Sequence, residues 1–361
     1  MASNGARNGA ADGNFLRNGW YAAGWRHEVE RDKPFARVLL GEPIVFYRRA
    51  DGSPVALEDR CCHRSLPLSV GEIVGDNLQC GYHGLVFDPA GDCVEIPGQL
   101  KIPPGATVRS YPVVDKHNLI WIWMGDPARA DAAAIPDLHW LDAPGWVAKP
   151  DYLHMKCDYR LIVENLLDTS HLTFVHKKTI GFSAIVDTPA KVERTDNAVI
   201  VSRWMYDIPP APSYQKLGFF DGNIDRCQIS HWTAPGTVSV DATKWPAGRG
   251  GSEADRSTAL EVFNLNTMTP ETANTSHYFW SQAIGPNANG DPTINEQYHN
   301  QVLEAFLEDK VLLEIQQSRI DQYGRSESEI DINADKGGLQ GRLILDGLIA
   351  AETAGAGRGG N

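Results

Sequence analysis

The chain of 361 residues has no long apolar run and no excess of basic residues. No stretch reaches the ~20 consecutive apolar residues that span a bilayer, and the most apolar segment, residues 119–124, is expected to be a buried strand. With 33 basic against 46 acidic residues and a net charge of −13, the chain lacks the basic clusters of nucleic-acid or anionic-membrane surfaces. We therefore expect no membrane and no nucleic-acid partner.

Cysteine is also scarce, with 6 residues in the chain. Residues 1–14 lack the cationic flank and apolar core of a secretion signal, so we expect a cytoplasmic protein. Residues 1–14 and the Gly/Ala-rich residues 351–361 are predicted to be disordered tails. Cysteines outside a metal site are then expected as buried thiols rather than disulfides, and four belong to this group: Cys62, Cys93, Cys157 and Cys227.

The two remaining cysteines each lie close to a histidine, in the motifs C-C-H at residues 61–63 and C-G-Y-H at residues 80–83. Zinc fingers group cysteine with cysteine and histidine with histidine, whereas each motif here mixes the two. In a Rieske [2Fe–2S] cluster, two histidines replace two of the four cysteines on one iron. The mixed motifs favour a Rieske cluster over zinc, with four predicted ligands: Cys61, His63, Cys80 and His83.

Three neighbours bear on this assignment. Cys62 is a second thiol beside the predicted ligands, and the C-x-H spacing points to Cys61 as the ligand and Cys62 as its neighbour. Gly81 and Gly84 suit a backbone that bends closely around a cluster. We therefore expect two tight loops, each supplying one thiolate and one imidazole.

The pattern of strands and helices predicts two domains. Short strands separated by turns indicate an antiparallel β domain over residues 15–127, which includes a hairpin around residues 88–91. Residues 128–150, rich in proline and alanine, are predicted to be a linker. Residues 151–350 mix strands with helices. The predicted class is α+β, with an N-terminal antiparallel β domain and a C-terminal α+β domain of antiparallel sheet and helices. In the C-terminal domain we expect strands within residues 192–207 and 257–279 and helices at 159–176, 294–323 and 339–352.

A cluster that only relays electrons needs an acceptor, and residues 165–176 contain a candidate. Two histidines and one carboxylate form the facial triad of non-haem Fe(II) oxygenases, which leaves coordination positions open. His171 and His176 are offset by about 140° on an ideal helix, so they converge only where a helix ends, kinks or bulges. Asp168 would share a helix face with His171 and accept its second N–H. A solvated Asp168 and histidines packed in the core are the alternative.

The third ligand must come from elsewhere, and Glu304, Glu308 and Asp309 on the predicted helix 294–323 are the candidates. An acid within an apolar stripe is costly unless it meets a charge partner or a metal. This favours Asp309 over Glu308, whose stripe is more polar. The apolar neighbours of Asp309 on its helix face are Val302, Phe306, Leu312 and Leu313.

These motifs resemble those of the Rieske non-haem iron oxygenases, specifically the terminal oxygenase group that includes vanillate O-demethylase, dicamba O-demethylase and toluenesulfonate methyl-monooxygenase. The likeness covers nearly the whole chain. It is carried by the cluster loops, the iron motif, the third-ligand segment and three further segments, at residues 61–69, 78–85, 164–176, 307–311, 121–127, 135–137 and 269–272.

The resemblance implies a monooxygenase with a [2Fe–2S] Rieske cluster and a mononuclear Fe(II). It implies a homotrimer in which Asp168 contacts His83 of the neighbouring chain, with Asn165 near the iron. The partners implied are an NAD(P)H-dependent flavin/iron-sulfur reductase, O₂ and a small aromatic substrate. The expected reaction is oxidative O-demethylation of a methoxylated aromatic acid, with release of formaldehyde.

Other activities stay open at this point. The alternatives within the family are N-dealkylation, methyl-group hydroxylation and ring or angular hydroxylation. A non-catalytic Rieske electron-transfer protein and a zinc-structured binding module are alternatives from other classes. The substrate pocket is expected within residues 181–267, and Asn266 stands where some relatives have a pocket histidine, which puts a carboxylate-binding role there in doubt.

Overall fold

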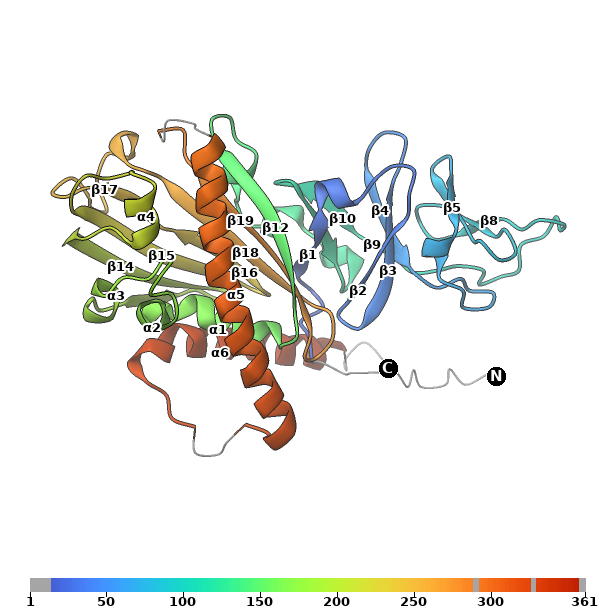
Figure 1. Ribbon diagram of the computed structural model, residues 1–361. Helices are drawn as coiled ribbons and strands as arrows, with labels where there is room; N and C mark the ends of the chain where they lie inside the picture. The colour runs from blue at the N-terminus through green and yellow to red at the C-terminus, as the bar shows by residue number, and fades with distance from the viewer. Residues whose placement is uncertain (1–13, 288–291, 326–328, 357–361) are drawn as a thin grey trace.

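The computed structural model describes residues 14–287, 292–325 and 329–356 and shows two domains side by side (Figure 1). The N-terminal domain consists of small antiparallel sheets. The C-terminal domain is built on one large antiparallel sheet with helices packed on it (Figure 1). This architecture confirms the predicted α+β class, with the antiparallel β domain first.

In the N-terminal domain the described strands form sheets with the orders β1-β11-β10, β2-β3-β4-β9 and β5-β6-β7-β8. Strand β11 is apolar and buried along its whole length, which confirms the buried strand expected there. The predicted hairpin is β7–β8, and it closes around Asp88, whose carboxylate accepts hydrogen bonds from the backbone N–H groups of Ala90 and Asp92. The strands are β1 (Trp20–Trp25), β2 (Phe35–Leu39), β3 (Glu42–Arg48), β4 (Pro54–Glu58), β5 (Glu72–Val74), β6 (Asn77–Gln79), β7 (Val86–Phe87), β8 (Cys93–Glu95), β9 (Ser110–Tyr111), β10 (Val113–Lys116) and β11 (Leu119–Trp123).

The large sheet has the order β12-β19-β18-β16-β15-β14-β13, and β17 pairs with β15. Its strands are β12 (Val147–Met155), β13 (Lys191–Arg194), β14 (Ala198–Ile208), β15 (Ile224–Thr233), β16 (Thr237–Asp241), β17 (Lys244–Pro246), β18 (Val262–Pro270) and β19 (Ser276–Ile284). The α-helices are α1 (Tyr159–Leu167), α2 (Leu172–Val175), α3 (Ala184–Asp187), α4 (Pro212–Lys216), α5 (Pro292–Tyr323) and α6 (Lys336–Ala356). Short 3-10 helices are η1 (Arg26–Glu28), η2 (Leu68–Val70), η3 (Pro127–Arg129), η4 (Ala132–Ala134), η5 (His139–Leu141), η6 (Thr169–His171), η7 (Arg256–Thr258) and η8 (Asn333–Asp335).

Alternation of side chains gives the large sheet two different faces. On β18, Asn264 and Asn266 line a pocket together with residues of α1 and α5. The residue between them, Leu265, belongs to an apolar cluster that contains Trp121 of the N-terminal domain. One face of the sheet therefore forms a helix-covered pocket, and the other contributes to the contact between the domains.

Hydrogen bonds also join the two domains. The ring of His277 on β19 contacts the carbonyl oxygen of Val38 through Nε2, at 2.9 Å, and the hydroxyl of Tyr152 through Nδ1, at 2.8 Å. Thr269 on β18 donates its hydroxyl hydrogen to the carbonyl oxygen of Ala22, at 2.7 Å. These contacts tie the edge of the N-terminal domain to the tips of β18 and β19.

The predicted linker, residues 128–150, is more ordered than its composition suggests. It begins within η3 and contains η4 and η5, and its last residues, 147–150, already belong to β12. Its prolines and alanines disguise the strand because Pro150 lies within β12 and pairs with Ser281 of β19. The sheet of the second domain therefore starts earlier than the predicted boundary at residue 151.

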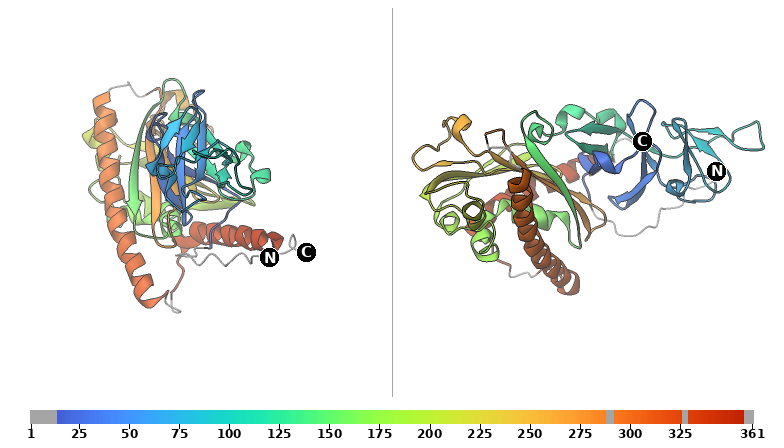
Figure 2. Two further views of the ribbon diagram at one scale, coloured as in Figure 1. Left: turned by 90° about the vertical axis from the view of Figure 1, so that its right-hand side faces the viewer. Right: turned by 45° about the horizontal axis from the view of Figure 1, so that its top comes forward.

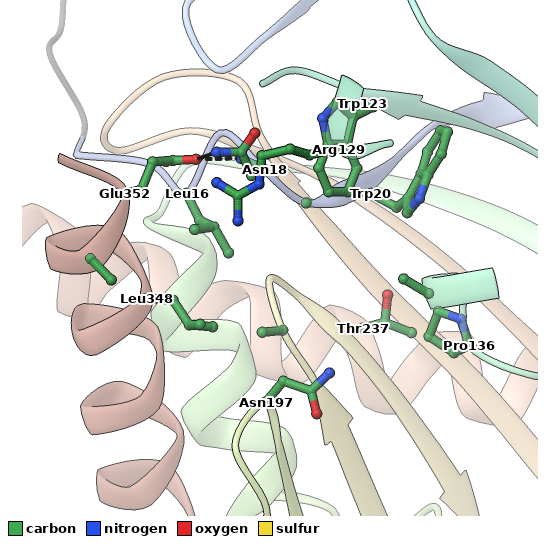
Figure 3. Close-up of a pocket in the computed structure, with 14 residues that line it drawn as sticks. Leu16, Asn18, Trp20, Trp123, Arg129, Pro136, Asn197, Thr237, Leu348 and Glu352 are labelled. Atoms are coloured by element: carbon green, nitrogen blue, oxygen red, sulfur yellow. Dashed lines mark hydrogen bonds between the residues drawn. The ribbon is translucent and has the colours of Figure 1, made fainter. Parts of the chain in front are cut away.

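The C-terminal tail prediction is wrong for residues 351–356, since α6 continues to Ala356. The carboxylate of Glu352 accepts hydrogen bonds from the backbone N–H groups of Arg17, at 2.7 Å, and Asn18, at 2.6 Å. The side-chain amide of Asn18 also donates to this carboxylate (Figure 3). Helix α6 is thereby held at the start of the N-terminal domain, and Figure 2 shows it lying across the base of the molecule. Residues 1–13 and 357–361, also predicted as tails, lie outside the described residues.

Two further differences concern the second domain. The predicted helix 159–176 is interrupted at Asp168, whose backbone is extended, with φ −95° and ψ 96°. Strands β15, β16 and β17 were not predicted, because each buries polar residues that in sequence indicate an exposed segment, among them Arg226, Thr237 and Lys244. In the part of the chain that the structure describes, no helix is long and apolar enough to cross a membrane.

Candidate metal centres

The two predicted cluster loops have the same backbone hydrogen bonds. Cys61 N–H donates to the carbonyl oxygen of Leu66, and Cys80 N–H donates to that of Leu85, five residues on in each loop. In return, Ser65 N–H donates to the carbonyl oxygen of Cys61, and Gly84 N–H to that of Cys80. Ser65 and Gly84, each four residues after the cysteine of its loop, both have positive φ, 59° and 72°. The chain thus builds one turn twice, from loops that follow β4 and β6.

In each cluster loop the predicted cysteine ligand is buried and the predicted histidine ligand is exposed. Cys61 and Cys80 are buried in one apolar cluster, whereas His63 and His83 are exposed and their ring centroids lie 4.6 Å apart. Cys62 is exposed. The two thiols and two imidazoles are therefore placed together as a donor set that fits a Rieske [2Fe–2S] cluster, with the histidines at the surface.

The glycines of the second loop have the roles expected of them. Gly84 adopts φ +72°, and a Cβ there would lie 2.9 Å from the Pro97 ring. A Cβ on Gly81 would lie 2.9 Å from the carbonyl oxygen of Val70. Any other residue at these positions would push the cluster loop away from η2 and from the segment that follows β8.

The second candidate centre forms where the helical segment breaks. Helix α1 ends at Leu167, the 3-10 helix η6 ends at His171, and the single turn α2 ends before His176. These breaks bring the two imidazole rings to a centroid distance of 5.3 Å. The convergence that an unbroken helix forbids is thus achieved by ending the helix.

Asp309 on α5 completes this centre. Its Oδ1 lies 3.6 Å from His171 Nε2 and 3.2 Å from His176 Nε2. One ligand atom from each of the three residues lies within 4.8 Å of the others, a spacing that could hold a metal ion. Two imidazoles and one carboxylate are the donor set of the facial triad, so the residues present fit Fe(II).

The surroundings of Asp309 match its predicted apolar stripe in three of four positions. Val302, Phe306 and Leu313 are buried, as Asp309 is, but Leu312 is exposed. Glu304, another candidate, is exposed and lies outside the cluster. The helix places Asp309 toward the histidines and leaves Glu304 on the outer side.

The role predicted for the Asp168 side chain is not what the single chain shows. His171 Nδ1 contacts the backbone carbonyl oxygen of Asp168, at 2.5 Å, rather than its carboxylate. The carboxylate instead accepts a hydrogen bond from the backbone N–H of Ser170 and caps η6. The prediction failed because it assumed an unbroken helix, in which residues 168 and 171 share a face.

Glu308 has a role that the sequence did not reveal. Its Oε2 lies 2.7 Å from His176 Nδ1, so the imidazole N–H donates to the carboxylate and Nε2 faces Asp309. Burial lowers the pKa of His176, but the Asp309 and Glu308 carboxylates outweigh burial and raise it overall. The same two carboxylates favour any cation at this position, a metal ion included.

Asn165 lies beside the same centre, as the resemblance implied. Its amide Nδ2 is 3.4 Å from Asp309 Oδ1. Asn165, His171, His176 and Asp309 all line one pocket between α1, α5 and the large sheet. A metal held there would face this pocket.

A second cavity, of about 300 Å³, lies between the start of the chain, the linker and α6 (Figure 3). Among the described residues that line it, Glu352 has the one carboxylate, and its oxygens are already engaged by Arg17 and Asn18. This cavity therefore has no donor set for a metal.

A β domain with a mixed thiol–imidazole loop pair, joined to a buried His/His/Asp centre, defines the class of Rieske non-haem iron oxygenases. Comparison with known families agrees. The model of the Rieske [2Fe-2S] domain matches residues 19–112, and that of the vanillate O-demethylase oxygenase C-terminal domain matches residues 155–351. The chain belongs to this oxygenase family, and it is an oxygenase component that uses a [2Fe–2S] cluster and a mononuclear iron.

Several relatives match the chain over nearly its full length. The iron-sulfur subunit of the toluene-4-sulfonate monooxygenase system of Comamonas testosteroni is 41% identical over 345 residues, which cover 94% of this chain and 99% of the relative. The vanillate O-demethylase oxygenase subunit of a Pseudomonas species is 34% identical over 343 residues, covering 94% and 96%. A crystal structure of dicamba monooxygenase bound to dicamba matches with a TM-score of 0.86 at 30% identity, covering 96% of this chain and 100% of that chain.

Proposed function

We propose that this chain is the terminal oxygenase of a system that oxidatively O-demethylates a methoxylated aromatic acid. The observation that carries the proposal is the presence, in one chain, of a donor set for an electron-relay cluster and a separate His/His/Asp centre that lines a pocket. A protein that only transferred electrons would need no such pocket. A binding module that held zinc in place of the cluster would not account for the His/His/Asp centre.

The reaction balances as follows. An aryl methyl ether, O₂, two electrons and two protons give a hydroxymethyl ether and water, and the hydroxymethyl ether breaks down to a phenol and formaldehyde. When bound, the cluster supplies electrons singly and the mononuclear iron supplies open positions for O₂. The electrons come from NAD(P)H through a partner reductase with flavin and iron–sulfur centres, and a cytoplasmic location belongs to the same proposal.

The residues of the chain hold and orient these groups. His171, His176 and Asp309 would hold the iron, and each imidazole donates its Nδ1 hydrogen to an oxygen, which leaves Nε2 directed at the centre. Apolar residues of α5 and β16, Phe306 and Val240 among them, line part of the pocket. Asn165 positions the Asp309 carboxylate.

Electrons would reach the iron from another subunit. The cluster loops lie near β5, at the far end of the N-terminal domain from α2 (Figure 1). A homotrimer in which Asp168 meets His83 of the partner subunit would replace this long route by a short one. The Asp168 carboxylate is free of any contact with His171, which leaves it available at the edge of the centre.

The pocket limits the substrate. It offers about 70 Å³ of free space, less than half of the ~150 Å³ cavity that accommodates benzene, so an aromatic ring enters only when the side chains that line the pocket move apart. Hydroxylation of an aryl methyl group is the second candidate reaction. The identity to the toluene-4-sulfonate subunit is higher than that to the vanillate subunit, 41% against 34%, which favours retaining this second reaction as a candidate.

The test is coupled turnover with a compatible reductase. Purified oxygenase, NADH and a panel of methoxybenzoates and methylbenzenesulfonates are assayed for O₂ uptake together with formaldehyde or benzyl-alcohol product. Formaldehyde equal to the O₂ consumed supports O-demethylation, and alcohol product supports methyl hydroxylation. If the whole panel gives neither product, the proposed function is wrong.

A further inference from the structure

Two buried basic residues lie side by side on the large sheet, and one of them, Arg226, lines the iron pocket. Arg226 on β15 and Lys244 on β17 are direct cross-strand partners. Their exposed fractions are 5% and 0%. Arg226, Gln228 and Ser230 alternate along β15 and line the same pocket as His171 and His176.

No acidic side chain balances this charge within the described residues. Neither cation takes part in an ion pair there, and Lys244 Nζ and Arg226 Nε lack hydrogen-bond partners. The one side-chain hydrogen bond of Arg226 is from its guanidinium to Gln228 Oε1, at 2.6 Å. Like charges directly opposite each other in a sheet are destabilising, and buried charges normally occur paired. The arrangement is therefore costly to the free protein.

The nearest acids are engaged elsewhere. Asp241 pairs with Arg256 and accepts hydrogen bonds from Thr243, and Asp225 accepts hydrogen bonds from the backbone N–H groups of Asp207 and Gly250. What faces the cations instead is aromatic. Lys244 Nζ lies 4.1 Å from the centre of the Tyr214 ring, and the Arg226 guanidinium lies 4.2 Å from that of Phe182. Burial, reinforced by the Arg226 charge, lowers the pKa of Lys244 well below its usual range.

We propose that Arg226 and Lys244 form the subsite that binds the anionic group of the aromatic substrate. Arg226, which lines the pocket, donates to the anion, and the Lys244 amine lies next to Arg226 as a further N–H donor. The inference rests on the proposed function and deepens it, because it assigns the residues that select an acid. The missing counter-charge of the free protein is supplied by the ligand.

Asn266 is the alternative residue for this role, and it is less suited to it. Asn266 lines the pocket, but its Oδ1 accepts a hydrogen bond from the Tyr278 hydroxyl, at 2.7 Å, and its Nδ2 donates to the Val238 carbonyl oxygen, at 3.4 Å. One amide hydrogen is left over, but a single neutral donor offers an anion neither the charge nor the paired N–H groups of a guanidinium. The planar fork of Arg226 suits carboxylate and sulfonate oxygens alike.

Binding of unreactive ligands tests the subsite independently of turnover. Calorimetric titration of the purified holoprotein with benzoate, benzenesulfonate and neutral benzamide compares one ring with and without charge. We expect the wild type to bind at least one anion roughly tenfold or more tightly than benzamide, and the stronger anion identifies the carboxylate or sulfonate as the group selected.

Arg226→Met should abolish that preference by weakening anion binding roughly tenfold or more while leaving benzamide binding unchanged. Lys244→Met should weaken anion binding several-fold and raise the unfolding temperature, because it removes a buried, unpaired amine. A merely structural lysine would lower the unfolding temperature when replaced. Lys149→Met, which removes a cation from the exposed pair with Glu296, is the matched control and should change neither ligand preference nor pocket affinity.

The inference is overturned if the wild type binds benzamide as tightly as both anions, or if both variants keep the anion preference. These results leave the proposed function standing when neutral aryl ethers still give formaldehyde in the coupled assay. Absence of product from every aromatic probe, combined with anion binding that depends on Arg226, would overturn the proposed function and leave the subsite in place.

Discussion

The imidazole of His176 is held at both of its nitrogens. Nδ1 donates to Glu308 at 2.7 Å, and Nε2 lies 3.2 Å from the Asp309 carboxylate. The adjacent residues Glu308 and Asp309 of α5 thus contact opposite nitrogens of the same ring. A carboxylate on the far nitrogen fixes the tautomer and strengthens the ligand.

Glu308→Ala should therefore lower iron affinity by roughly 10–100-fold while leaving the [2Fe–2S] cluster intact. The measurement is iron retained at the mononuclear centre after dialysis against increasing chelator, with the visible spectrum reporting the cluster. Glu304→Ala, one turn earlier on the exposed side of α5, is the control and should retain iron like the wild type. Equal retention by the Glu308 variant would mean that its contact with His176 has no effect on the metal.

Asp168→Asn should preserve both metal centres and slow electron transfer between them. Asparagine retains the cap on Ser170 N–H, and the backbone carbonyl that holds His171 is unchanged. The loss of the carboxylate removes the proposed contact with His83 of the partner subunit. Stopped-flow mixing of reduced protein with substrate and O₂ should show cluster reoxidation slowed by an order of magnitude or more. Reoxidation at the wild-type rate would place the electron route elsewhere.

Single residues were predictable where the chemistry of one side chain decided the outcome. The choice of Asp309 followed from the apolar stripe around it, and the structure brings it to the two histidines. The Glu308 contact was missed because its partner lies 132 residues away, and no local pattern reports such a distance. The position of the Asp168 carboxylate was wrong because it depended on where a helix ends.

At the scale of elements, long periodic segments were predictable and irregular ones were not. Helices α5 and α6 begin within three residues of the predicted starts at 294 and 339. The break at Asp168 was missed, and strands β15–β17 were missed because they bury polar residues that normally indicate an exposed segment. Arg226 and Lys244 look like surface residues in sequence and are buried in the structure.

The contact between the domains should weaken at acidic pH through His277. Burial, reinforced by the Arg37 charge, lowers the pKa of His277 to about 4 from its ordinary 6.5. The unfolded chain therefore takes up a proton at higher pH than the folded one, so stability falls as pH drops from about 6.5 toward 4. At pH 5 this amounts to about 2 kcal/mol relative to neutral pH.

His277→Gln, which can still donate to the Val38 carbonyl oxygen, should lose this dependence. The measurement is the difference in unfolding temperature between pH 7 and pH 5, which we expect to be smaller in the variant than in the wild type. His139→Gln replaces an exposed histidine and serves as the control. If the unfolding temperatures at pH 7 and pH 5 differ as much in the His277 variant as in the wild type, protonation of His277 does not cause the loss of stability.

At the scale of the whole molecule, one exposed face of α5 is apolar. Leu307, Val311 and Ile315 are spaced by one helical turn and have exposed fractions of 43%, 58% and 56%. A stripe of this kind beside the iron centre is suited to a contact between subunits. It lies on the helix that carries Asp309, so a partner bound there would come close to the electron acceptor.

Ile315→Lys should therefore convert the proposed trimer to monomers and suppress turnover, with the cluster spectrum unchanged. Light scattering measures the mass. Leu343→Lys, at an equally exposed apolar position on α6, is the control and should remain trimeric and active. An active monomer, in the wild type or the variant, would contradict transfer of electrons between subunits.

The central claim is that one chain holds two separate metal centres, and iron content tests it most directly. The wild type should contain about three iron atoms per chain, two in the cluster and one at the His/His/Asp centre. His171→Ala should contain about two, keep the EPR signal of the reduced cluster, and release no product. A His171 variant that retained the third iron and full turnover would contradict the account.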